Sequence, residues 1–229
     1  MQIDVIDTDI QKVTHNMPSR LFDEEEMYTY IETFCSSKGL SQTVRVLPYV
    51  KEKHEGQFRK SVKINDFGNP EKIPYINHPL LMTCHAISLG LLDDSLLSAM
   101  LLHDVCEDCG VLVSELPVND ETKEIVRLVT KTEDFDTPGG DKRYFEAIAN
   151  NTKASLVKII DRCNNLSGMT SCYTEKRMAE YILETNTYIM PLLEKIHIEH
   201  PEYSHEVFLI KYHMSSIIDS IRHYMARKM

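Results

Sequence analysis

Residues 95–108, SLLSAMLLHDVCED, form a segment that is apolar on nearly every side of a helical projection and ends in a group of polar side chains. Asp93 or Asp94 stands just before the segment, where a helix N-cap belongs. A helix that is apolar all round is normally buried in the middle of a domain. We therefore predict a central buried helix with a polar end. The polar residues are His103, Asp104, Glu107 and Asp108.

The rest of the sequence also follows a helical period. Capping residues such as Asp23 and stop glycines such as Gly39 and Gly90 mark where helices begin and end. No convincing stretch alternates apolar and polar residues as a strand would, so we predict an all-α fold. The predicted helices cover about residues 23–37, 41–55, 79–89, 95–108, 121–131, 141–150, 153–168, 174–199 and 204–227.

Two segments stand apart. Residues 59–76 (RKSVKINDFGNPEKIPYI) carry turn residues without a period, and a loop of that length inside a compact domain is usually functional. The last helix repeats apolar residues every three or four positions, which predicts a helix packed on the domain, with a homodimer seam as the alternative. These apolar residues are Val207, Ile210, Met214, Ile217, Ile221 and Tyr224. We expect an N-terminal extension (1–22), an HD-type domain (23–200) and a C-terminal helix (201–229).

Composition excludes several classes of protein. The chain has 229 residues, 42% of them hydrophobic, which suits one domain with a substantial core. Its net charge of −10 argues against nucleic-acid binding, since such binding depends on lysine and arginine neutralising phosphates. No apolar run approaches the roughly 18 residues of a membrane span, and the N-terminal residues lack the pattern of a signal peptide. Six cysteines without framework spacing predict reduced thiols and a cytoplasmic location.

The polar end of the 95–108 helix predicts a metal site. At about 100° per residue, His103 shares a helix face with Glu107, and Asp104 shares one with Asp108. Neighbouring carboxylates near a core repel one another and are costly to remove from water, so a cation must lie among them. A divalent metal suits the mixed nitrogen and oxygen donors of His103 and Asp104.

Two further residues can complete a ligand set. His78 precedes a helix-starting proline, and an antiparallel pair of helices can bring it near His103. Asp161 lies in the very apolar helix SLVKIIDRCNNL, where an unpaired carboxylate would be costly. Asn165 follows one turn later on the same face. Together with His103 and Asp104, His78 and Asp161 would form a site of two imidazoles and two carboxylates that leaves open positions for water.

Five stretches, in order, carry a resemblance to a known superfamily. They are HEGQFRKS (54–61), PYINHP (74–79), SAMLLHDVCED (98–108), LVTK (128–131) and LVKIIDRCNNL (156–166). The pattern resembles the HD-domain phosphohydrolases, and among them the hydrolase domain of the RelA/SpoT alarmone enzymes and the stand-alone small alarmone hydrolases. The resemblance covers roughly residues 41–193 and implies an all-α HD-domain bundle with a single-metal site. It also implies a hydrolase-only protein, because the family's synthetase and regulatory domains have no room here.

The resemblance assigns roles to individual residues. The family holds one Mn²⁺ per active site, and other divalent metals fit the same donors; the matching ligands are His78, His103, Asp104 and Asp161. The acidic pair that positions the attacking water matches Glu107 and Asp108. The expected nucleotide contacts are Arg59, Lys60, Ser61, Lys131 and Asn165. Two departures are a longer insertion (62–73) and DRCNN in place of the family's usual apolar residue and histidine before the asparagine.

These roles imply a metal-dependent hydrolase that removes the 3′-pyrophosphate of guanosine tetra- or pentaphosphate and leaves GDP or GTP. The expected partner is this nucleotide. An alternative enzyme is another HD phosphohydrolase, such as a nucleotidase or a hydrolase of adenosine alarmones or phosphorylated dinucleotides, which could serve as an antitoxin by hydrolysing a toxin's product. A binding module that acts by contact would be expected to lack the intact metal set. A purely structural helical protein leaves the clustered carboxylates unexplained.

Overall fold

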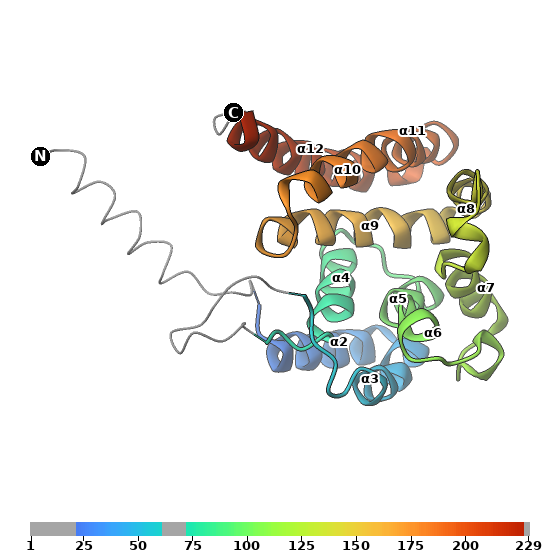
Figure 1. Cartoon of the computed structure of the whole chain (residues 1–229). Helices are drawn as coiled ribbons and strands as arrows, with labels where there is room; N and C mark the ends of the chain where they lie inside the picture. The colour runs from blue at the N-terminus through green and yellow to red at the C-terminus, as the bar shows by residue number, and fades with distance from the viewer. Residues whose placement is uncertain (1–21, 61–71, 227–229) are drawn as a thin grey trace, which may run out of the picture.

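The computed structural model of the chain describes residues 22–60 and 72–226, and these residues are arranged as an all-α bundle (Figure 1). The only strand-like feature among them is an isolated bridge between Phe58 and Pro74. The α-helices are α2 (Glu24–Lys38), α3 (Ser41–Lys53), α4 (Asn77–Ser88), α5 (Asp94–Leu102), α6 (Val105–Asp108), α7 (Asp120–Val129), α8 (Gly140–Ala149), α9 (Thr152–Gly168), α10 (Glu175–Glu184), α11 (Met190–Glu199) and α12 (Ser204–Ala226). The predicted all-α fold is confirmed.

Helix α9 is the central element of the bundle. It crosses the middle of the molecule, with α11 and α12 on one side and α4 and α5 on the other, while α7 and α8 pack at one end (Figure 1). Helices α2 and α3 complete the lower layer against α4 and α5. Every residue of α5 after Asp94 is buried, as its apolar sequence predicts. The fully buried helix α5 therefore packs against the central helix α9.

Side-chain caps define where the main helices begin. The carboxylates of Asp23 and Asp93 and the amide of Asn151 accept hydrogen bonds from backbone N–H groups in the first turns of α2, α5 and α9. Each such cap satisfies a donor that has no partner within the helix, and stabilises the helix by about 1 kcal/mol. Gly39 ends α2 with a φ of 72°, a conformation that glycine adopts without steric cost. These boundaries follow the sequence signals closely.

Two predicted helices are interrupted. The predicted 95–108 helix breaks at Asp104, whose backbone (φ −100°, ψ −7°) separates α5 from α6. The predicted 174–199 helix contains a π-helical turn, Thr185–Ile189, between α10 and α11. Pro191 follows this turn and has no N–H to donate, and a widened turn accommodates such a break in the hydrogen-bond ladder. The spacing of apolar residues in the sequence predicts neither of these two interruptions.

The apolar stripe of α12 packs within the same chain. Its buried residues face α9 and α11, and they are Val207, Ile210, Met214, Ile218 and Ile221. Tyr224, which the sequence placed on this stripe, is 52% exposed. Most of the stripe is therefore used in packing within the chain, as the predicted helix packed on the domain requires. No helix in the described part of the chain is long and apolar enough to span a membrane.

Gly140, the first residue of α8, provides a test of this packing. A Cβ atom at Gly140 would lie 1.8 Å from the carbonyl oxygen of Asp134, so the backbone would have to shift. We expect Gly140→Ala to destabilise the protein by about 1–3 kcal/mol and to lower its melting temperature by roughly 2–12 °C. The matched control is Gly168→Ala, where a Cβ meets nothing within 4 Å. Equal melting temperatures for the two variants, measured by circular dichroism, would contradict the close contact.

Candidate metal centre

The four predicted metal ligands converge from three helices. His78 is the second residue of α4, His103 and Asp104 form the junction between α5 and α6, and Asp161 lies in the middle of α9. The Nε2 atoms of His78 and His103 are 3.2 Å apart. The Oδ2 atom of Asp104 lies 2.8 Å from His103 Nε2, and the Oδ1 atom of Asp161 lies 3.2 Å from His78 Nε2. The donor atoms of His78, His103 and Asp104 all lie within 4.8 Å of one another, and Asp161 adjoins this group through its contact with His78.

Hydrogen bonds on the far side of each ring set its orientation and tautomer. The Nδ1–H of His78 donates to the Oδ1 atom of Asn164 at 2.5 Å, and the Nδ1–H of His103 donates to the carbonyl oxygen of Met100 at 2.9 Å. Both partners are acceptors, so the proton of each neutral ring is on Nδ1 and the lone pair is on Nε2. With both rings neutral, the two Nε2 lone pairs face each other, which is the arrangement of a pair of metal-binding histidines.

The charges of the surrounding side chains also favour a cation between the two histidines and the two carboxylates. Burial disfavours a charged imidazole, but the Asp104 and Asp161 carboxylates outweigh burial and raise the pKa of His103 to about 9. Burial alone would raise the pKa of Asp161, yet Lys158 and the two histidines hold it well below its usual value. Both carboxylates are therefore ionised beside imidazole nitrogens. Two nitrogen and two oxygen donors of this kind suit a divalent metal, and the residues present fit one.

Three residues near the ligands were not assigned a role from the sequence. The Lys158 ammonium lies 2.8 Å from the Oδ2 atom of Asp161 and is buried with it. The Tyr75 hydroxyl donates to the Oδ2 atom of Asp104 at 2.5 Å. Asn164 accepts from His78. The i,i+3 spacing of Lys158 and Asp161 was a usable signal, whereas the other two contacts depend on how α4 and α9 pack.

The acidic pair does not share a buried face with the His-Asp pair as predicted. Both Glu107 and Asp108 are exposed, because the break at Asp104 changes the direction of the chain before α6. The Oε2 atom of Glu107 accepts the backbone N–H of Lys131 at 3.1 Å. Asp108 lies close enough to the Tyr75 phenol that its negative charge raises the pKa of Tyr75, after burial and Asp104. The pair therefore lies at the solvent side of the metal centre.

Two of the predicted nucleotide contacts lie directly beside the ligands. Asn165 donates to the Oδ1 atom of Asp161 at 2.6 Å. The Arg59 guanidinium donates to the side-chain oxygens of Asn164 at 3.2 Å and Asn165 at 2.7 Å. Arg59 is held there because residues 57–59 pair with residues 73–75 through the bonds Arg59 N–H to Ile73 O and Tyr75 N–H to Gln57 O.

The other predicted contacts lie further out. The Lys131 ammonium lies 4.3 Å over the Phe135 ring, and burial followed by repulsion from Lys158 lowers the pKa of Lys131. Lys60 is exposed, and Ser61 lies outside the described residues. Arg162, a neighbour of Asp161 in sequence, is engaged elsewhere, because its guanidinium bonds Glu184 and the hydroxyl of Thr185.

No family model matches the chain, but individual proteins do. The guanosine-3′,5′-bis(diphosphate) 3′-pyrophosphohydrolase MESH1 of Xenopus tropicalis is 33% identical over 143 residues, which are 58% of this chain and 74% of that protein. Human MESH1 is 30% identical over 153 residues, or 62% of this chain and 79% of that protein. The Escherichia coli bifunctional (p)ppGpp synthase/hydrolase SpoT is 25% identical over 77% of this chain and 25% of its own length.

The fold agrees with these sequence matches. A solved structure described as a metazoan ortholog of SpoT that hydrolyses ppGpp superposes with a TM-score of 0.59, at 20% identity, over 78% of this chain and 94% of that one. At this identity the superposition shows a common all-helical fold. The two MESH1 sequences are at least 30% identical and are matched over about three quarters of their length. The chain therefore belongs to the family of MESH1-type guanosine-3′,5′-bis(diphosphate) 3′-pyrophosphohydrolases.

Proposed function

We propose that this protein hydrolyses guanosine 3′-pyrophosphates, converting ppGpp or pppGpp to GDP or GTP and pyrophosphate. Water adds to the phosphorus atom bonded to the 3′ oxygen, the bond between that oxygen and phosphorus breaks, and the 3′ oxygen takes up a proton. The observation that carries the proposal is the pair of imidazole Nε2 atoms 3.2 Å apart, flanked by two ionised carboxylates. Membership in the MESH1 family supports the substrate.

The residues that would hold the metal are His78, His103, Asp104 and Asp161. A divalent metal there lowers the pKa of bound water and polarises a phosphoryl oxygen. We propose Mn²⁺, since it accepts both hard oxygen and imidazole donors. Asn164 and Met100 orient the two histidine rings for this role through the Nδ1–H bonds. Tyr75 and Lys158 orient the carboxylates of Asp104 and Asp161 in the same way.

Glu107 and Asp108 are proposed to handle the proton of the attacking water. Both carboxylates are exposed, so water reaches them, and they follow Asp104 by one helical turn. A carboxylate in reach of the nucleophile contributes about 10²–10⁴-fold as a general base. Glu107 is held by the Lys131 N–H, which favours a positioning role. Asp108, beside Tyr75, is the better placed base because Tyr75 contacts the ligand Asp104 directly.

Cationic side chains are proposed to bind the phosphates. The net charge of −10 repels an anionic nucleotide, so local cations must offset it. Arg59 bonds the side chains of Asn164 and Asn165, and Lys158 lies beside Asp161. The backbone N–H of Lys131 bonds the Glu107 carboxylate, which places this lysine near the acidic pair. We also propose substrate roles for Asn165, Lys60 and Ser61, which rest on the family motif. A cytoplasmic location is proposed as well, supported by the free state of all six cysteines.

Metal binding is tested first. We expect the purified protein, equilibrated with Mn²⁺ and freed of excess metal, to retain about one Mn²⁺ per chain. His103→Ala should lose the metal, because it removes one of two facing imidazoles. His197→Ala, an exposed histidine of α11, is the matched control and should retain it. The measurement is atomic emission on protein of verified helicity. Full metal content in His103→Ala would refute this ligand set.

The acidic pair is tested with metal loaded. We expect Asp108→Asn to lower kcat for ppGpp by about 10²–10⁴-fold, with unchanged Mn²⁺ content, since the residue is not among the proposed ligands. Glu107→Gln should lower it less, because the amide oxygen can still accept the Lys131 N–H. Asp136→Asn, an exposed carboxylate of the 3₁₀ turn Glu133–Asp136, is the control. Pyrophosphate release is measured, and wild-type kcat in Asp108→Asn would exclude it as the base.

A further inference from the structure

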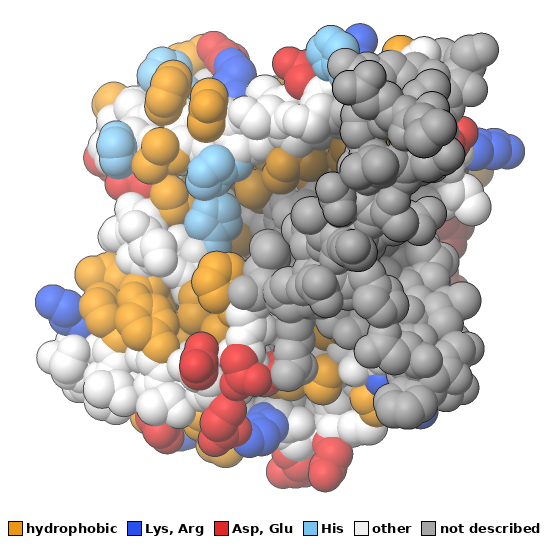
Figure 2. All heavy atoms as spheres, turned by 90° about the vertical axis from the view of Figure 1, so that its left-hand side faces the viewer, with side chains coloured by type: hydrophobic (Ala, Val, Ile, Leu, Met, Phe, Trp, Pro, Cys, Tyr) orange, Lys and Arg blue, Asp and Glu red, His pale blue; other side chains and the backbone are white. Residues whose placement is uncertain are grey.

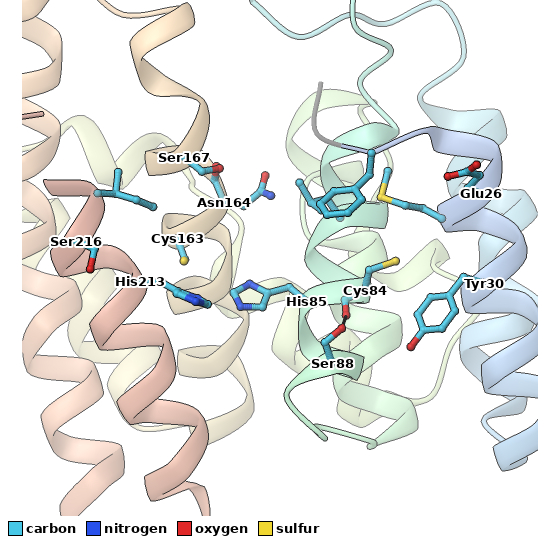
Figure 3. A pocket seen from close by; sticks show the side chains of 14 residues that line it. Glu26, Tyr30, Cys84, His85, Ser88, Cys163, Asn164, Ser167, His213 and Ser216 are labelled. Carbon is cyan, nitrogen blue, oxygen red and sulfur yellow. Dashed lines mark hydrogen bonds between the residues drawn. The ribbon is translucent and has the colours of Figure 1, made fainter. Parts of the chain in front are cut away.

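A pocket lies between α2, α4, α9 and α12, lined by none of the proposed metal ligands. It has a volume of about 680 Å³. Figure 2 shows the face on which it lies, where apolar and histidine side chains gather between the upper and lower helices. In Figure 3, His85 of α4 and His213 of α12 approach each other across its floor, with ring centroids 5.8 Å apart. Nothing in the proposed reaction uses this pocket.

The charge of the lining indicates what it can hold. Among the described residues that line it, none is a lysine or arginine, and the one charged side chain is the Glu26 carboxylate. Burial, followed by repulsion from His213, lowers the pKa of His85, which keeps that imidazole neutral near pH 7. An anionic molecule, such as the nucleotide, would meet a carboxylate and no cation among the described lining residues. The pocket therefore suits a neutral ligand.

The volume of the pocket and the polarity of its lining indicate more closely which ligands it can bind. Pockets of roughly 300–1,000 Å³ with apolar walls and a few polar groups are typical small-molecule sites. Here the walls include Met27 and Leu81, and the aromatic rings of Phe22 and Tyr30 remain 55% and 43% exposed at the edge. The buried Nε2 atom of His85 has no hydrogen-bond partner among the described residues. An aromatic or alkyl molecule with at most one or two polar groups matches this lining.

Asn164 connects the pocket to the metal centre. Its side chain lines the pocket beside Cys163 and Ser167 of the same helix (Figure 3). The same side-chain oxygen accepts the Nδ1–H of His78 and a guanidinium N–H of Arg59. A ligand that shifts Asn164 must therefore change the orientation of a proposed metal ligand and of a proposed phosphate-binding cation.

We propose that this pocket binds a neutral, largely apolar small molecule, and that its occupancy is coupled through Asn164 to metal binding at His78. Binding to the pocket is independent of the proposed reaction. The coupling rests on the proposed role of His78 as a ligand. Because coupling free energies are reciprocal, Mn²⁺ must change the affinity for the pocket ligand by the same factor as the pocket ligand changes the affinity for Mn²⁺.

The first experiment measures binding. N-phenyl-1-naphthylamine, a neutral fluorescent apolar probe, is titrated into the Mn²⁺-loaded full chain, and we expect saturable binding of one probe per chain. Ser216→Trp on α12 and Ser88→Trp on α4 place a large ring in the pocket from opposite walls. Each should weaken probe binding at least tenfold. Ser215→Trp, exposed on the same helix but outside the lining, is the matched control.

The tryptophan variants separate failure of the pocket proposal from failure of the proposed hydrolase function. Ser216 and Ser88 contact none of the proposed catalytic residues, so their variants should retain Mn²⁺ and pyrophosphate release. Wild-type probe affinity in both tryptophan variants, or no saturable binding to the wild-type chain, would overturn the pocket proposal. Neither result depends on whether ppGpp is the substrate. Circular dichroism confirms that each variant is folded.

The second experiment measures coupling. We expect the dissociation constant of the probe to differ by at least about fivefold between metal-free and Mn²⁺-loaded protein, the lower end of ordinary coupling. Asn164→Ala should abolish this difference, because it removes the acceptor shared by His78 and Arg59. Equal probe affinities with and without Mn²⁺ in the wild-type chain would refute the coupling. A difference that persists in Asn164→Ala would refute the proposed route.

Discussion

The organisation of the site depends on two imidazole nitrogens that face each other at 3.2 Å. Each ring donates its Nδ1–H to an acceptor, so two lone pairs meet where a proton or a metal must lie between them. This contact brings α4 against the junction of α5 and α6, and Asp161 adds α9 to the same point. The apolar packing of α5 and α9 is what places such polar groups together, since a buried helix that carries an ionised side chain must supply its counter-charge locally.

Two positive charges of the chain itself act on these carboxylates. Lys158 neutralises Asp161, and a proton on His103 is favoured by Asp104, which raises the pKa of His103 to about 9. A divalent metal held by these residues would supply the positive charge that the proton supplies here, and Lys158 lies 2.8 Å from the Asp161 carboxylate. The lysine is therefore a largely buried cation directly beside the candidate metal centre. An acidic protein can in this way bind an anionic nucleotide at one point of its surface.

Most of the fold, and the convergence of His78, His103 and Asp104, could be predicted from the sequence, for reasons that are local. Helix boundaries follow caps such as Asp23 and Asn151, and the all-apolar period of α5 requires burial. The error concerns the junction after His103, where the chain turns between α5 and α6 and carries Glu107 and Asp108 to the surface. A helical projection assumes a continuous helix and cannot show such a turn. Asn164 and Tyr75 were missed because their contacts join segments 86 and 29 residues apart, which no periodicity records.

Helix α9 explains how one element can serve two sites. At about 100° per residue, Asn165 returns to the face of Asp161, while Cys163 and Ser167 lie on the opposite side, which lines the pocket between α2, α4, α9 and α12. Asn164 falls between these faces, about 60° from Asp161. It can therefore line the pocket and still reach His78. The two adjacent asparagines bond different ligands. Asn165 donates a hydrogen bond to the Asp161 carboxylate, and Asn164 accepts one from the His78 ring. Because Arg59 bonds both amides, any displacement of Asn164 also reaches Asn165 and, through it, the second carboxylate of the metal centre.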